Sequence, residues 1–87
     1  MSNYNLNSYK YNPRDFIGMP SLLEDLSGFY EMLEIYRKDK NSTTDWLNFR
    51  RQWENVFFSI KHREVEGCLD TATAQEIRDY LEELAND

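Results

Sequence analysis

The chain has 87 residues, of which 40% are hydrophobic, 15% aromatic and 30% charged, and its net charge is −6. This length suits one small domain, and two Trp, five Phe and six Tyr residues supply enough apolar area to exclude disorder along the whole chain. Its apolar runs fall well short of the ~20 residues of a membrane span, residues 1–11 are too polar for a signal peptide, and a lone cysteine excludes an intrachain disulfide, so we expect a cytoplasmic protein.

Residues 1–20 form an aromatic arm in which tyrosines alternate loosely with asparagines. Asn12 is expected to cap a single helical turn that Pro13 opens and that Gly18 and Pro20 end. We predict that the arm lies across the helices of residues 21–87 or forms a fourth short helix. The alternative is an arm that becomes ordered on a partner.

The first helix is predicted to start at Ser21, because Ser21 and Glu24 match a capping box. Apolar residues then recur at steps of three and four and form one stripe: Leu22, Leu26, Phe29, Leu33 and Tyr36. Three basic residues, Arg37, Lys38 and Lys40, suit the negative end of the helix dipole, so the helix is expected to end before Asn41.

The second helix is expected to begin at Ser42, Thr43 or Thr44 and to end at or before Gly67. It has the heaviest apolar stripe of the chain, made by Trp46, Phe49, Trp53, Val56, Phe57 and Ile60. We interpret Trp46, Phe49, Trp53 and Phe57 as core rather than as a ligand pocket. Leu47 and Phe58 lie about 100° from this stripe, and we predict that the arm covers them. The alternative is that they belong to an interface.

The third helix is expected after Leu69, with Asp70, Thr71 or Thr73 as its N-cap. Its buried stripe would contain Ala74, Ile77, Leu81 and Leu84. No segment shows sustained strand alternation. The sequence therefore predicts an all-α fold, an antiparallel three-helix bundle over residues 21–87 that is preceded by the arm of residues 1–20.

Few residues suggest chemistry. His62 is the only histidine and is expected to be exposed, while Cys68 is expected to be a small buried hydrophobic residue. No phosphate loop, calcium loop, zinc spacing or dinucleotide motif is present, so we expect a non-enzymatic protein without cofactor or metal. The basic cluster of the second helix is expected to pair with neighbouring glutamates rather than with nucleic acid; it comprises Arg50, Arg51, Lys61 and Arg63.

Charge is concentrated near the carboxyl terminus, where residues 67–87 contain six acidic residues against Arg78 alone and so have a net charge of −5. Such a field repels nucleic acid and anionic lipid and attracts basic proteins. On the third helix, one flank is expected to present Glu76, Asp79 and Glu83, with Tyr80 at its border. We predict that these four residues bind a partner. The simpler alternative is a solvated face that keeps a small protein soluble.

Two segments, NSTTDWLNFRRQW (residues 41–53) and LDTATAQEIRDYLEEL (residues 69–84), resemble the small acidic immunity proteins that neutralise colicin-like and contact-dependent growth-inhibition toxins. The resemblance implies a cytoplasmic, non-enzymatic inhibitor that occludes the active site of a basic nuclease domain through complementary charge.

The favoured hypothesis is therefore an immunity protein or antitoxin that binds a basic protein partner and neither nucleic acid nor membrane directly. A second hypothesis is a phage-encoded nucleic-acid mimic that blocks a host defence enzyme. A third is a helical adaptor or homodimer that uses Phe58, Leu47 and the arm.

Overall fold

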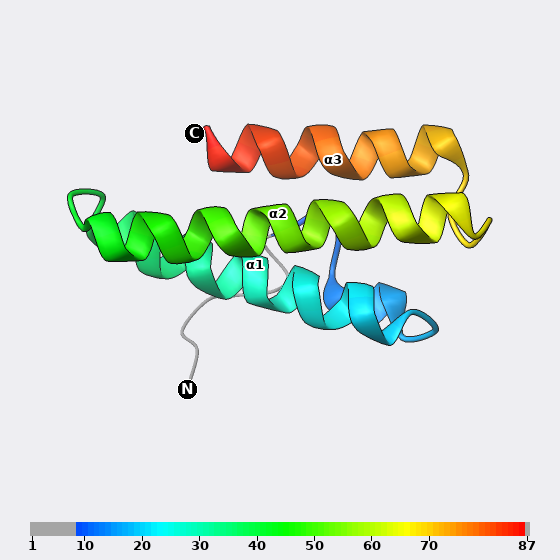
Figure 1. The fold of residues 1–87 in the computed structure, drawn as a ribbon, viewed down its shortest axis with the longest axis horizontal. Helices are drawn as coiled ribbons and strands as arrows, with labels where there is room; N and C mark the ends of the chain where they lie inside the picture. The colour runs from blue at the N-terminus through cyan, green and yellow to red at the C-terminus, as the bar shows by residue number, and fades with distance from the viewer. Residues whose placement is uncertain (1–8, 87) are drawn as a thin grey trace.

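The computed structural model describes residues 9–86, and it confirms the all-α prediction. A short 3₁₀ turn, η2 (Pro13–Phe16), precedes three helices, α1 (Pro20–Lys38), α2 (Thr43–Val65) and α3 (Thr71–Ala85). Consecutive helices run antiparallel, and α2 packs against both α1 and α3 (Figure 1). None of the described helices combines the length and the apolar character needed to cross a membrane.

Local signals set the start of η2, but the start of α1 differs from the prediction. Asn12 caps η2: its side-chain oxygen accepts the Arg14 backbone N–H at 3.2 Å, and the Asp15 carboxylate accepts the Asn12 N–H at 3.2 Å. The predicted Ser21 cap is wrong, because α1 already begins at Pro20. Proline at the first helical position has its φ preset for the helix and lacks an N–H that would need a partner.

The amino-terminal ends of α2 and α3 follow the predicted caps. Ser42 caps α2 by accepting the Asp45 N–H at 3.2 Å, and Asp70 takes the N-cap position of α3. Between them, Gly67 has a φ of +84°, and the Cys68 N–H turns back to the Arg63 carbonyl at 2.8 Å. This turn leaves Cys68 exposed, so the prediction that it is buried is wrong.

The buried stripes of α1 and α3 are as predicted except at their carboxyl-terminal ends, where Tyr36 and Leu84 are only half-buried. On α2 the difference is larger. Phe49, Val56 and Ile60 are fully buried, whereas Trp46, Trp53 and Phe57 are half-buried beside them. Of the four aromatic residues predicted as core on α2, only Phe49 lies at its centre. The other three extend from the core to the surface.

Gly28 allows α1 and α2 to approach closely. A Cβ atom at this position would lie 2.7 Å from the Nε2 atom of Gln52 on α2. The same Nε2 atom donates a hydrogen bond to the Asp25 carbonyl of α1 at 3.0 Å. The glycine thus makes room for a side chain of α2 that binds the backbone of α1.

We expect Gly28→Ala alone to change the free energy of unfolding by less than about 0.5 kcal/mol. The gain in helix propensity, about 1 kcal/mol, is offset by the loss of the Gln52 hydrogen bond, which contributes about 1 kcal/mol. In a Gln52→Ala background there is no hydrogen bond to lose, so the gain in helix propensity remains. Gly28→Ala should then raise the free energy of unfolding by about 1 kcal/mol. Urea unfolding of the four proteins in this cycle measures both values; destabilisation in both backgrounds would contradict the assignment.

Candidate functional site

The amino-terminal arm fills the space between α1 and α3. The ring of Tyr9 stacks on Tyr30 of α1 at a centroid distance of 3.9 Å, and its hydroxyl donates to Glu34. The ring of Tyr11 meets Tyr80 of α3 edge-on at 5.5 Å, and its carbonyl accepts the Tyr30 hydroxyl. The prediction that the arm lies across the helices is therefore confirmed from residue 9 onwards; residues 1–8 lie outside the described part of the chain.

The described part of the arm, residues 9–20, does not cover Leu47 and Phe58, although the sequence predicted that it would. Leu47 and Phe58 on α2 are 54% and 75% exposed, respectively. The prediction is wrong because the rings of Tyr9 and Tyr11 pack against Tyr30 of α1 and Tyr80 of α3, on another side of the bundle. Among residues 9–86, nothing covers the outer side of α2.

Two of the four predicted partner-binding residues contact the arm. The Tyr11 hydroxyl donates to Glu76 Oε2 at 3.1 Å, and Lys10 Nζ lies 3.9 Å from Glu76 Oε1. The Tyr80 hydroxyl accepts the Lys10 backbone N–H at 2.9 Å. Burial and the hydrogen bond to Glu76 raise the pKa of Tyr11, so that its hydroxyl stays a neutral donor. The arm thus joins Glu76 and Tyr80 into one polar and aromatic surface.

The other two predicted residues, Asp79 and Glu83, lie exposed on the same flank of α3. Asp79 accepts a hydrogen bond from Gln75 Nε2 at 2.8 Å, which leaves its charge in place. We call Glu76, Asp79, Tyr80 and Glu83 the acidic flank. The structure brings its members together along three successive turns of one helix.

The one basic residue of α3, Arg78, does not neutralise this flank. Its guanidinium Nη1 binds Glu64 Oε1 of α2 at 3.1 Å, and both side chains are largely shielded from solvent. The hydrogen bond from Arg78 lowers the pKa of Glu64. Because Arg78 is used in the contact between α2 and α3, the acids of the flank keep their negative field.

The basic cluster of α2 divides into two parts. Lys61 lies 3.9 Å from Glu64, and Arg63 binds Glu66 at 2.8 Å, as the pairing prediction requires. Arg50 and Arg51 are exposed, and within residues 9–86 neither has an ion-pair or hydrogen-bond partner. Internal pairing therefore accounts for only the carboxyl-terminal half of the cluster.

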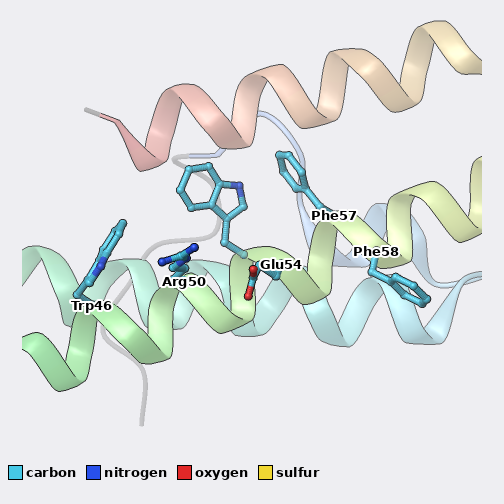
Figure 2. Close-up of a pocket in the computed structure, with 6 residues that line it drawn as sticks. Trp46, Arg50, Glu54, Phe57 and Phe58 are labelled. Atoms are coloured by element: carbon cyan, nitrogen blue, oxygen red, sulfur yellow. The ribbon is translucent and has the colours of Figure 1, made fainter.

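The outer side of α2 has an apolar groove, although three of its aromatic residues, Trp46, Trp53 and Phe57, were predicted to be core rather than part of a pocket. Its volume is about 550 Å³, and its walls come entirely from this helix (Figure 2): Trp46, Arg50, Trp53, Glu54, Phe57 and Phe58. The signal for it was present in the sequence, since Leu47 and Phe58 lie off the buried stripe. Only the position of the arm shows that nothing in the described chain fills the groove.

A smaller polar hollow of about 250 Å³ contains Asp25, Ser59 and His62. Ser59 donates its hydroxyl proton directly to Asp25, and His62, exposed as predicted, pairs with Glu66 at 3.1 Å. A nucleophile activated by an imidazole would require a hydrogen bond between serine and histidine. The Ser59–Asp25 hydrogen bond thus joins α2 to α1, whereas His62 pairs within α2. No group of His, Cys, Asp and Glu residues within residues 9–86 is arranged to hold a metal ion.

Comparison of the chain with protein families, with curated proteins and with solved structures finds no match. The function must therefore be argued from the geometry of the acidic flank and of the groove.

Proposed function

We propose that this protein is a non-enzymatic inhibitor that binds and neutralises a basic toxin or nuclease domain, in the manner of an immunity protein or antitoxin. The observation that supports the proposal most directly is that Arg78 is turned towards Glu64 on α2. The acids on the other flank of α3 are therefore available to cations from outside.

The flank offers a partner both charge and a rigid anchor. Its carboxylates accelerate encounter with a basic surface, and the Tyr11–Tyr80 ring pair supplies the partly apolar contact typical of interface hot spots. Lys10 is a weak internal competitor for Glu76, because the pair is 3.9 Å apart and both side chains are more than half exposed. A lysine or arginine of the partner replaces it at little cost.

We expect the combined substitution of Glu76, Asp79 and Glu83 by alanine to slow association with the basic partner about 10- to 100-fold at low salt, with a smaller effect on dissociation. Stopped-flow mixing with a basic nuclease toxin domain measures the two rates over a salt series. The inhibition of its nuclease activity at equimolar inhibitor provides the functional readout.

A matched control removes three exposed acids elsewhere, by substituting Glu24, Glu31 and Asp39 with alanine. Both variants change the net charge equally, so a local site predicts a much smaller effect from the control. Equal slowing by both variants would indicate general attraction only. Unchanged binding of the first variant would show that the acidic flank is not the binding site.

A further inference from the structure

The outer side of α2 carries an apolar surface that a small domain does not need for its own core. Phe58 and Val65 are each 75% exposed, and Leu47 is 54% exposed. Phe58 lines the groove of about 550 Å³ and also a neighbouring hollow of about 340 Å³ that reaches Val65. A continuous exposed apolar surface of this kind marks an interaction site in soluble proteins.

The groove contains a pattern that is complementary to itself. Trp46, Arg50, Glu54 and Phe58 follow each other at four-residue steps, the spacing that forms one ridge on a helix surface. The ridge therefore has an aromatic ring at each end and two opposite charges in the middle. An antiparallel partner presents the same four residues in the reverse order. The aromatic residues of the two copies then face each other, and Arg50 of each copy faces Glu54 of the other.

The two central charges have no partner within the described chain. Arg50 and Glu54 are exposed, and among residues 9–86 neither makes an ion pair or a hydrogen bond. Figure 2 shows both on the same side of α2, between Trp46 and Phe58. An arginine placed one turn before a glutamate is the less favourable order for pairing within a helix. Both groups are thus available to a second helix.

We propose that a second copy of this chain occupies the groove, so that two α2 helices pack antiparallel about a two-fold axis that passes between Arg50 and Glu54. Trp46 of each copy then packs on Phe58 of the other, and Arg50 of each copy pairs with Glu54 of the other. Because the contact is isologous, every interaction occurs twice. Packing of four-residue ridges against each other gives a crossing angle of about −50°.

The charge distribution favours self-association through this face of α2 over self-association through α3. Residues 45–66 contain four acidic and four basic residues and have no net charge, whereas residues 67–87 have a net charge of −5. A dimer through α2 thus keeps the acidic flanks of α3 out of the contact. The acidic flank remains free for the partner proposed above, and neither proposal depends on the other.

Charge reversal tests the geometry directly. Sedimentation equilibrium of the wild type, from about 1 μM to about 500 μM, should show a reversible monomer–dimer equilibrium. Arg50→Glu and Glu54→Arg should each raise the dissociation constant at least about tenfold, because like charges then meet twice. The double variant Arg50→Glu/Glu54→Arg should restore the dimer. An equimolar mixture of the two single variants should form a heterodimer, since their charges are complementary.

Controls separate local pairing from general repulsion. Lys38→Glu and Glu31→Arg make the same charge changes at exposed positions of α1 and should leave the dissociation constant unchanged. Far-UV circular dichroism of each variant verifies that the helices are intact. A wild type that is monomeric at every concentration would overturn the proposal. So would a dimer that tolerates both single reversals, or single variants whose mixture does not recover association.

Discussion

Replacement of Phe49 by alanine is expected to destabilise the fold by about 3–5 kcal/mol, the usual cost of removing a fully buried phenylalanine. Phe49 has no exposed surface, and its ring contacts rings of both α1 and α2 at centroid distances of 5.2 Å (Phe29), 5.6 Å (Tyr36) and 5.9 Å (Trp53). A domain this small has a total stability towards the lower end of about 5–15 kcal/mol, so the variant would lose much of it. Urea unfolding followed by far-UV circular dichroism measures the change.

Phe58→Ala is the matched control, because it removes the same ring from an exposed position of the same helix. At protein concentrations low enough to keep the chain monomeric, its effect on the free energy of unfolding should stay within about 0.5 kcal/mol. If Phe49→Ala cost no more than this control, the aromatic cluster between α1 and α2 would not be the principal core.

Replacement of Tyr30 by alanine is also expected to cost about 3–5 kcal/mol, and in addition to release the arm. Tyr30 is fully buried, stacks on Tyr9 and donates its hydroxyl to the Tyr11 carbonyl. Tyr30→Phe separates the two roles: the ring stays, while the lost hydrogen bond costs about 1 kcal/mol. Trypsin cleavage after Lys10 should then accelerate about fivefold, because cleavage follows the population of the released arm.

Tyr36→Phe provides the comparison for the loss of a hydroxyl. Tyr36 lies on the same helix, but its ring stacks on Phe49 and packs near Trp46, away from the arm. Its removal should leave cleavage after Lys10 at the wild-type rate. Equal acceleration by both variants would mean that the hydroxyl of Tyr30 does not hold the arm.

Helix ends were predictable from local interactions to within one to three residues, although for α2 and α3 three nearby residues competed as the N-cap. Asn12, Ser42 and Gly67 act at the positions that their residue types favour, because each such interaction joins residues only two to five apart. Ser21 failed as a cap because Pro20, an equally local signal, begins the helix one residue earlier. The prediction that Cys68 is buried was wrong because the burial of a residue in a connection depends on which side of the turn faces the core.

The candidate site was only partly predictable. Helical periodicity placed Glu76, Asp79, Tyr80 and Glu83 on one flank, as the structure has them. Periodicity could not show that Lys10 and Tyr11 contact that flank, or that Arg78 binds Glu64 of α2 instead of an acid of the flank. These contacts join residues up to 70 positions apart in the chain.

By itself, the sequence determined the helical class, the approximate helix ends and the concentration of acid near the carboxyl terminus, because all three depend on composition or on neighbours within about one turn. Only the tertiary structure decided which side of the bundle the arm covers and which charges stay free. The physical reason is that the arm's tyrosines could pack on several apolar surfaces of the bundle. Tyr9 stacks on Tyr30 and Tyr11 packs edge-on against Tyr80, and these contacts leave the groove of α2 open.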